Sequence, residues 1–251
     1  MKSAKRLLKL QEFFSTEEFI DSETLSNRLN ASDSTIRRDL IELETRGVLR
    51  RVHGGAISLK ARDELLDFKR LTVSFHEEKI RIGKAAASLV KDSQTLILGT
   101  GSTVVEVAKN LFGRPLQIIT NSIPVAQVFW DCKSVEITLT GGYLYPRVGA
   151  QLGPICEQML TSVHADIAIL GVAGISEHGL TDSNTLIMGT VRKMIERARE
   201  VFIVADHSKF GRDVMVRVAA LDEVDVVVSD QALSPEFRAL LREHNVRCVL
   251  A

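Results

Sequence analysis

The first sixty residues place apolar side chains at the spacing of amphipathic helices. The stripes are Leu7, Leu10 and Phe14, then Leu25 and Leu29, then Ile36, Leu40 and Leu43. Apolar residues at i, i+3, i+4 and i+7 form one face of a helix, which is buried against a core. The pattern therefore predicts three helices in the N-terminal part.

Beyond about residue 92 the pattern changes to short β-branched runs alternating with helix-like stretches. The runs span residues 95–98, 117–120, 135–140, 167–171, 201–205, 225–229 and 246–250. The helix-like stretches span residues 104–111, 124–130, 155–160, 187–199 and 235–243. This alternation predicts a mostly parallel sheet covered by helices, so the fold class is α/β.

Three segments follow from these patterns. We expect a helical domain over residues 1–58, a larger α/β domain over residues 77–251, and a charged, weakly periodic linker over residues 59–76. A chain of 251 residues suits this division.

Composition excludes several classes of protein. The apolar runs are strand-length, and the N-terminus has no continuous apolar stretch, so we expect a cytoplasmic protein without a membrane partner. Cys132, Cys156 and Cys248 are odd in number and widely spaced, which favours reduced thiols over disulfides or a zinc site. We expect neither a metal nor a cofactor.

Charge adds a modest indication of a nucleic-acid partner. The net charge is zero, but residues 1–62 hold twelve Lys and Arg against nine Asp and Glu. Five arginines lie within fifteen residues: Arg37, Arg38, Arg46, Arg50 and Arg51.

The third predicted helix has the features of a DNA-reading helix. Ser32 is a suitable N-cap, and Asp33 suits the positive end of the helix. With the apolar stripe buried, Ser34 and Arg38 point outward and Arg37 lies on one flank. The N-terminal residues of such a helix meet base edges and phosphates in the major groove. Asn30-Ala31 before it forms a connector of helix-turn-helix length.

A basic hairpin is predicted to follow this helix. Gly47 is a candidate C-cap, and two short alternating runs then resemble the wing of a winged helix. The candidate contacts to double-stranded DNA are Ser32, Ser34, Thr35, Arg37, Arg38, Arg50, Arg51 and His53. Two alternatives are a solvated helix whose Asp39, Glu42 and Glu44 pair with its arginines, and a protein-interaction module. The order helix, turn, helix, basic wing favours DNA.

The clearest ligand signal is the segment 96–104, in which a buried strand runs through a glycine-hydroxyl loop into a helix. Gly101 allows close approach of the backbone, and the helix N-terminus attracts an anion. Thr100, Ser102 and Thr103 add hydroxyl groups, so phosphate is the expected ligand. A simple capped turn is the alternative interpretation.

Further small polar groups come at or after other strands. They are Asn121, Ser122, Gly141, Gly142, Asp182, Asp206 and Lys209. Ligands of open parallel sheets bind at the carboxyl ends of the strands, so one shared pocket is expected. Taken one at a time, Asp182, Asp206 and Lys209 are more often surface or capping residues.

The stretch STIRRDLIELETRGVLRRVHGGAI resembles the N-terminal module of the DeoR family of bacterial regulators. The segments TNS at 120–122, GG at 141–142, GLT at 179–181 and ADHSKFG at 205–211 are similar to the family's sensor domain. The resemblance implies a winged helix-turn-helix domain followed by a domain folded like ribose-5-phosphate isomerases and CoA transferases. It also implies operator binding, most often repression of a carbohydrate operon, and a phosphorylated sugar as effector.

Two positions depart from the family pattern. Gly99 stands where many members carry Asp, and Val191 stands where a Lys is common. Both positions bear on which effector is bound.

The expected function is therefore a homo-oligomeric repressor, a dimer or tetramer, modulated by a sugar phosphate. The alternative is a sugar-phosphate isomerase with an added DNA-binding domain. Such an enzyme needs a positioned general base, and the stretch GVAGISEHGLTDSN at 171–184 shows no paired acid–base motif. We therefore expect no enzymatic activity.

Overall fold

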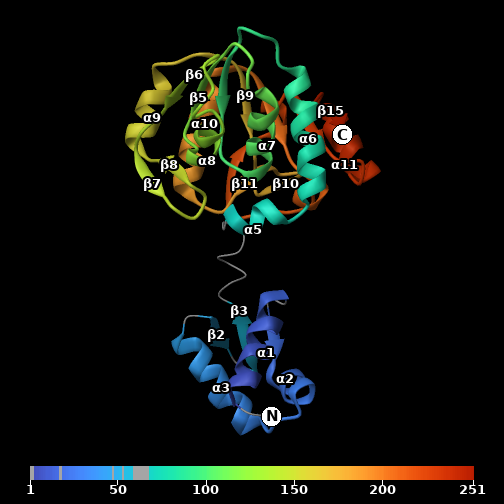
Figure 1. Cartoon of the computed structure of the whole chain (residues 1–251). Coiled ribbons are helices and arrows are strands. Elements are labelled where there is room, and N and C mark those ends of the chain that lie inside the picture. Colours follow the sequence, from blue (N-terminus) through green and yellow to red (C-terminus); the bar gives the residue numbers. More distant parts are fainter. Residues whose placement is uncertain (1–2, 17–18, 47, 53, 59–67) are drawn as a thin grey trace. The chain divides into compact units, whose positions relative to one another are not determined.

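A computed structural model of the chain describes residues 3–16, 19–46, 48–52, 54–58 and 68–251. The chain divides into two compact units, Met1–Leu65 and Leu66–Ala251, which are considered separately (Figure 1). No helix of the described ranges is long and apolar enough to cross a membrane.

The smaller unit packs three helices on a small antiparallel sheet. The helices are α1 (Ser3–Thr16), α2 (Ser22–Leu29) and α3 (Asp33–Thr45). The sheet has the order β1-β3-β2, with β1 at Phe19–Asp21, β2 at Leu49–Val52 and β3 at Gly55–Ser58. The predicted apolar stripes are confirmed, because the same eight side chains are buried in one core. A winged helix-turn-helix fold results.

Two local features fix the turn between α2 and α3. The side chain of Asp21 caps α2 by accepting from the amide of Thr24 at 2.8 Å. Asn30 ends α2 in the left-handed conformation with φ of 47°, which asparagine tolerates better than most residues. The hydroxyl of Ser26 then donates to Asp33 at 2.6 Å and ties α2 to the start of α3.

The larger unit is built on a seven-stranded parallel sheet with the order β15-β14-β12-β9-β4-β5-β6. Its strands are β4 (Thr95–Leu98), β5 (Leu116–Thr120), β6 (Val135–Leu139), β9 (Ala165–Leu170), β12 (Ala198–Val204), β14 (Val226–Ser229) and β15 (Arg247–Leu250). Each of the seven predicted runs overlaps one of these strands, so the α/β prediction is confirmed.

Helices cover both faces of this sheet in Figure 1. They are α5 (Phe68–Val73), α6 (His76–Leu89), α7 (Ser102–Leu111), α8 (Ile123–Val128), α9 (Pro154–Thr161), α10 (Thr185–Glu196) and α11 (Pro235–Glu243). The stretch 59–76, expected to be a linker, overlaps α5 and the first residue of α6, and residues 59–67 lie outside the described residues. The helix α5 is only six residues long, too short for a periodic signal, and it lies at the lower end of the unit in Figure 1, where it packs against α7 and not on a face of the sheet.

Two further sheets were not predicted. A hairpin joins β7 (Tyr143–Tyr145) to β8 (Ala150–Leu152), and an antiparallel sheet joins β10 (Gly174–Ser176), β11 (Gly179–Asp182) and β13 (Val216–Ala219). Their strands have only three or four residues, and they do not alternate with helices as the equally short β4 and β14 do.

The order of strands creates a switch point beside β4. The chain runs from β4 outward to β5 and β6, and then returns to the other side of β4 as β9. After β4 the chain continues to one side of the sheet, and after β9 it continues to the other side. Open α/β sheets bind ligands at such a point. The two loops are in contact where they begin, because a Cβ on Gly171 would lie 2.9 Å from the carbonyl oxygen of Thr100.

Candidate DNA interface and effector pocket

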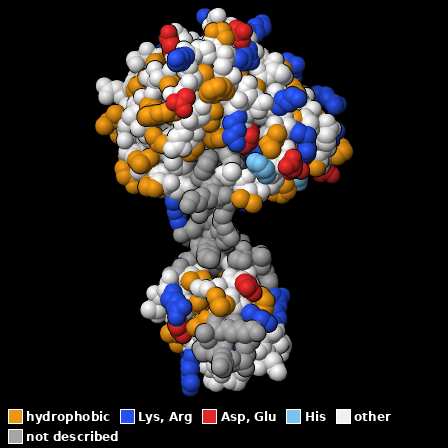
Figure 2. Space-filling view, in the orientation of Figure 1, with side chains coloured by type: hydrophobic (Ala, Val, Ile, Leu, Met, Phe, Trp, Pro, Cys, Tyr) orange, Lys and Arg blue, Asp and Glu red, His pale blue; other side chains and the backbone are white. Residues whose placement is uncertain are grey.

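The helix α3 buries its predicted face and exposes polar groups at its N-terminal end. Ile36 and Leu43 have no exposed surface, whereas Ser34, Arg37 and Arg38 are exposed. Figure 2 shows Lys and Arg side chains on the surface of the smaller unit. The expected orientation of the helix is confirmed. Its contacts with DNA remain a prediction.

The hydroxyl groups at the start of α3 form a local cluster. Ser32 occupies the N-cap position as predicted, but its side chain makes no capping hydrogen bond to the backbone. It lies instead 3.1 Å from the hydroxyl of Ser34 and 2.9 Å from that of Thr35. Three hydroxyl groups are therefore gathered at the end of α3 that is expected to meet DNA.

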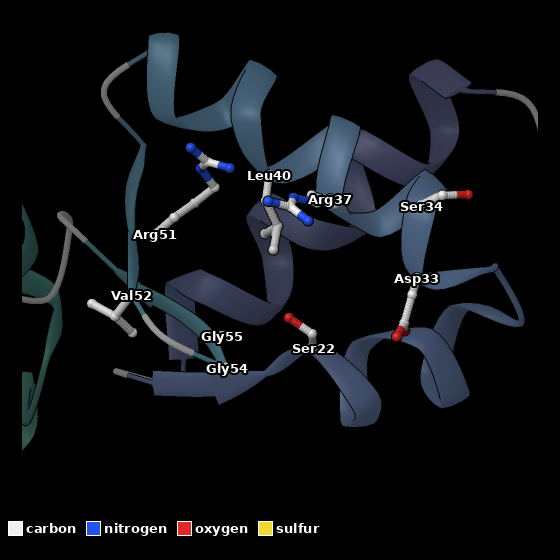
Figure 3. Close-up of a pocket in the computed structure, with 9 residues that line it drawn as sticks. All are labelled: Ser22, Asp33, Ser34, Arg37, Leu40, Arg51, Val52, Gly54 and Gly55. Atoms are coloured by element: carbon white, nitrogen blue, oxygen red, sulfur yellow. The ribbon is translucent and has the colours of Figure 1, made fainter.

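A groove separates the start of α3 from the hairpin β2–β3. It has a volume of about 570 Å³ and is lined by Ser22, Asp33, Ser34, Arg37, Leu40, Arg51, Val52, Gly54 and Gly55. In Figure 3 Arg37 comes from α3 and Arg51 reaches from β2 toward that helix. The groove therefore combines two guanidinium groups with the hydroxyls of Ser22 and Ser34, a set of donors suited to a phosphate backbone.

The five arginines between residues 37 and 51 fall into two groups. Arg51 donates to Glu44 through its backbone amide at 2.8 Å and its Nε at 2.7 Å, and this contact lowers the pKa of Glu44. Arg46 pairs with Glu42 four residues earlier, through Nη2. Glutamates of α3 therefore do pair with arginines, as one alternative interpretation held, although Arg51 belongs to β2 and not to the helix.

The other group is unpaired. Within the described residues, Arg37, Arg38 and Arg50 form no hydrogen bond or ion pair, and all three side chains are exposed. They carry the positive charge of the unit without an intramolecular partner, as a surface for an anionic polymer would. His53 and Gly47 lie outside the described residues.

Asp39 has a structural role that its position does not reveal. It follows two exposed arginines in sequence, yet it is 4% exposed and forms an ion pair with Arg6 of α1. A second hydrogen bond joins Arg6 Nη2 to Asp39 Oδ1 at 3.1 Å, and the pair raises the pKa of Arg6. This contact fixes α3 against α1.

In the larger unit, the loop after β4 has the geometry expected of an anion site. Gly101 adopts φ of 127°, which favours glycine, and is the N-cap of α7. Ser102 and Thr103 form the first turn of this ten-residue helix and are each 6% exposed. The first amides of a helix have no partner within it, so they are available to an anion.

The loops after β5 and β6 meet at Gln151 of β8. The amide of Asn121 donates to the Gln151 carbonyl at 3.0 Å, and the Gly141 backbone N–H donates to its side chain at 3.0 Å. The Oδ1 atom of Asn121 is buried and has no partner among the described residues. A buried acceptor without a partner is costly and indicates a ligand position.

Two of the expected pocket residues have local structural tasks. The hydroxyl of Ser122 caps α8 by accepting from the amide of Val125 at 3.3 Å. Gly142 packs so closely that a Cβ would lie 2.7 Å from the carbonyl oxygen of Leu152. Neither observation tests a contact with the effector, which stays a prediction for both.

The acidic and basic candidates interact electrostatically. Burial lowers the pKa of Lys209, and the charges of Asp206 and Asp182 oppose that shift. Burial also raises the pKa of Asp182, which is 8% exposed. Asp206 is completely buried; one of its oxygens accepts from Ser208, and the other, Oδ2, has no partner among the described residues. Ionisable groups this deeply buried are concentrated at functional sites.

Sequence reasoning missed three side chains in this region: Lys79, His207 and Asp230. Lys79 of α6 is 2% exposed, and its charge acts on the same cluster. His207 lies with Nδ1 2.9 Å from Oδ2 of the buried Asp230. The available signal for Lys79 was its position on the apolar face of α6, three residues before Ile82.

The two departures from the family pattern can now be placed. A Cβ on Gly99 would lie 2.9 Å from the Leu170 side chain, so Leu170 fills the space that a larger residue would need. Val191 is 7% exposed and belongs to the buried face of α10. In the described part of the chain, no group of three His, Cys, Asp or Glu side chains is arranged to hold a metal ion.

The fold and these two sites define a class: a winged helix-turn-helix DNA-binding protein with an α/β ligand-sensing domain. The family described as DeoR-like helix-turn-helix domain matches residues 6–62, and that described as DeoR C terminal sensor domain matches residues 74–231. The chain belongs to the DeoR family of transcriptional regulators.

Its similarity to individual members extends over the whole length. The HTH-type transcriptional repressor GlcR of Bacillus subtilis (strain 168) is 35% identical, with 100% of this chain and 97% of that protein covered. The glycerol-3-phosphate regulon repressor of Escherichia coli (strain K12) is 31% identical, with 100% of both chains covered. These relatives are named as transcriptional regulators.

A solved ribose 5-phosphate isomerase A from Methanocaldococcus jannaschii is similar to part of the chain. It is 20% identical, covers 55% of each chain and has a TM-score of 0.41. A likeness at this level says nothing about the activity of this chain.

Proposed function

We propose that this protein represses a carbohydrate-metabolism operon in the cytoplasm and that a phosphorylated sugar relieves or modulates the repression. The observation that carries the DNA-binding half is the set of unpaired arginines, Arg37, Arg38 and Arg50, around α3 and β2. Two relatives are named as repressors, one of them of the glycerol-3-phosphate regulon.

The reading of DNA is assigned to the start of α3 and to the hairpin. Ser32, Ser34, Thr35, Arg37 and Arg38 enter the major groove, and Arg50, Arg51 and His53 contact phosphates. A homo-oligomer, at least a dimer, places two copies of α3 on repeated half-sites of the operator.

The effector is assigned to the carboxyl ends of the parallel strands. Thr100, Gly101, Ser102 and Thr103 bind the phosphate, while the hydroxyl groups of the sugar are bound by Asn121, Ser122, Gly141, Gly142, Asp182, Asp206 and Lys209. Support comes from the free amides at the start of α7 and from the unpartnered oxygens of Asn121 and Asp206. We assign this pocket to binding and not to catalysis.

The DNA-binding assignment is tested with Arg38→Ala in a titration of operator binding. Loss of a base contact lowers the affinity by about 1–3 kcal/mol. The matched control is Arg46→Ala, because Arg46 lies on the same helix and already pairs with Glu42. Unchanged affinity of the Arg38 variant would remove that side chain from the interface.

The effector assignment is tested by combining Ser102→Ala with Thr103→Ala. We expect operator binding to be kept and the response to sugar phosphates to be lost, because two hydroxyl donors to the phosphate are gone while α3 is unchanged. A response that survives the double substitution would contradict the assignment of the loop. An assay for ketose–aldose interconversion with the wild-type chain tests the exclusion of isomerase activity.

A further inference from the structure

The strand β6 at one edge of the seven-stranded sheet leaves apolar side chains uncovered. One side of β6 pairs with β5, and its other side pairs with no described strand. Ile137, Thr138 and Leu139 are all exposed, although successive side chains of a strand point to opposite faces of the sheet. The strand at the opposite edge, β15, packs against α6 and α11. The strand β6 is therefore exposed along its outer edge and on both of its faces.

The turn, hairpin and helix that follow β6 continue this apolar surface. Tyr143 and Leu144 of β7 are 62% and 49% exposed. Ile155, in the first turn of α9, is 68% exposed and lies beside the turn after β6, because a Cβ on Gly141 would be 3.8 Å from its Cγ2. Figure 2 shows hydrophobic side chains gathered on the side of the larger unit where Figure 1 labels β7, β8 and α9. We name this surface the β6–α9 face, and its exposed side chains are Ile137, Thr138, Leu139, Tyr143, Leu144 and Ile155.

The stretch of chain that forms this face is nearly free of charge. Residues 137–156 hold one charged residue in twenty, Arg147, whereas 25% of the whole chain is charged. Exposed sheet edges are usually protected from other strands by charged side chains or a covering helix. The one charged residue of β6 is Glu136, which accepts a hydrogen bond from Gln117 of β5 at 3.2 Å. Loss of charge with exposed tyrosine is the composition of the core of a protein interface.

Charge also decides which partner this face fits. A polyanion or a strongly charged protein would find no opposite charge on it. A second copy of the chain places the same apolar side chains opposite each other without repulsion between like charges. Around a twofold axis, the outer edge of β6 meets the same edge of the other copy in antiparallel orientation, and the assembly closes because each copy uses the same face.

We propose that the β6–α9 face is the surface through which two copies of this protein associate. The inference rests on the proposed function in one respect, because an operator with repeated half-sites requires two DNA-binding units in one particle. The face lies entirely in the larger unit, so the DNA-binding unit contributes no residue to it. Substitutions in the face therefore change self-association without touching the side chains that read DNA.

The test is sedimentation velocity of the full chain over a series of concentrations, which gives the dissociation constant of the dimer. The first variant combines Tyr143→Glu with Ile155→Glu. Both side chains are exposed, and a glutamate suits the first turn of a helix, so we expect the fold to be kept, as circular dichroism checks. Two apolar contacts are lost and like charges then face each other, so the dissociation constant should rise by about a hundredfold or more.

A second variant, Ile137→Glu, has a matched control and decides the matter if the first variant does not fold. Ile137 and Ile80 are 36% and 37% exposed, but Ile80 belongs to α6, which packs beside β14 and β15 at the other edge of the sheet. Ile137→Glu should raise the dissociation constant by about tenfold or more. Ile80→Glu should associate as the wild type does.

The outcomes separate this inference from the proposed function. A wild-type chain that stays monomeric, folded variants that associate as the wild type does, or an equal loss in Ile80→Glu would overturn the inference. A tetrameric wild type that becomes dimeric in the variants would support it, because the face then forms one of two interfaces. If the wild type binds its operator while the variants still associate, the proposed function stands and the face falls. If the wild type binds no operator, the proposed function falls, while sedimentation still decides the role of the face.

Discussion

Substitution of Asp39 separates a structural residue from the DNA-reading residues beside it. Asp39 directly follows Arg37 and Arg38, so its sequence position suggests an exposed charge on the DNA-reading helix. Its side chain is instead 5% exposed and pairs with Arg6, which is 12% exposed. We therefore expect Asp39→Ala to destabilise the smaller unit and to affect DNA binding only through that loss of stability.

The size of the effect follows from the burial of the pair. Removing one partner of a fully buried ion pair costs about 3–5 kcal/mol, whereas exposed pairs contribute about 0–1 kcal/mol. Arg6 keeps some contact with solvent, so we expect a loss of about 2–4 kcal/mol. At about 0.05–0.15 kcal/mol per residue, a unit of this size has only about 3–10 kcal/mol of stability. Asp39→Ala should therefore leave it marginally stable.

The assay is hydrogen exchange of α1 and α3 in the full chain, together with a titration of operator binding. Asp39→Ala should speed exchange in both helices and leave the larger unit unchanged. Glu42→Ala is the control: Glu42 lies on the same helix but forms an exposed pair with Arg46, so its loss should cost no more than about 0.5 kcal/mol. If Asp39→Ala kept wild-type protection and still lost the operator, Asp39 would act at the DNA and the structural reasoning would be wrong.

Three further predictions concern the arginines, a glycine turn and a buried acid. Arg37→Ala should weaken operator binding and lower the slope of log affinity against log salt concentration by about one unit. Arg51→Ala should have a smaller effect, because the guanidinium of Arg51 already pairs with Glu44. Titrations at several salt concentrations compare the two variants. Gly142→Ala should lower the thermal unfolding midpoint of the protein more than Gly113→Ala does. Both glycines have positive φ, but only at Gly142 would the added Cβ collide with a backbone oxygen, at 2.7 Å. Burial raises the pKa of Asp182 above its unfolded value of about 4, so stability should fall as the pH rises from there through the folded pKa. Asp182→Asn should flatten this decline in unfolding experiments over a series of pH values.

Much of the fold could be predicted because its signals are local. The helical stripe of Ile36, Leu40 and Leu43 is buried as its spacing predicts, and the seven runs of β-branched residues each overlap a strand of one sheet. These patterns depend on the period of a helix or strand and on burial of one face, which neighbouring residues encode. The short strands β10, β11 and β13 were missed: β10 and β11 form a hairpin of only three and four residues, and β13 pairs with it from a distant segment of the chain.

The candidate site was predictable only in part. The loop Thr100–Thr103 could be identified because a glycine-hydroxyl turn between a strand and a helix is a contiguous pattern. Lys79 could not be identified in this way, because the fold brings its neighbours, the carbonyl of Leu71 and the carboxylate of Asp206, from other parts of the chain. The same holds for Arg6 and Asp39, which are separated by 33 positions.

The sequence by itself determined the α/β class, the helix-turn-helix and the glycine-hydroxyl loop before α7, since periodicity and local turn chemistry require no knowledge of distant contacts. Only the tertiary structure decided that Arg46 and Arg51 form ion pairs and that Asp39 holds α3 against α1. It also decided that the carbonyl oxygen of Leu71 accepts from Ser102 at the start of α7. The physical reason is that hydrogen bonds and ion pairs act over a few ångströms, so their partners are set by how distant segments pack.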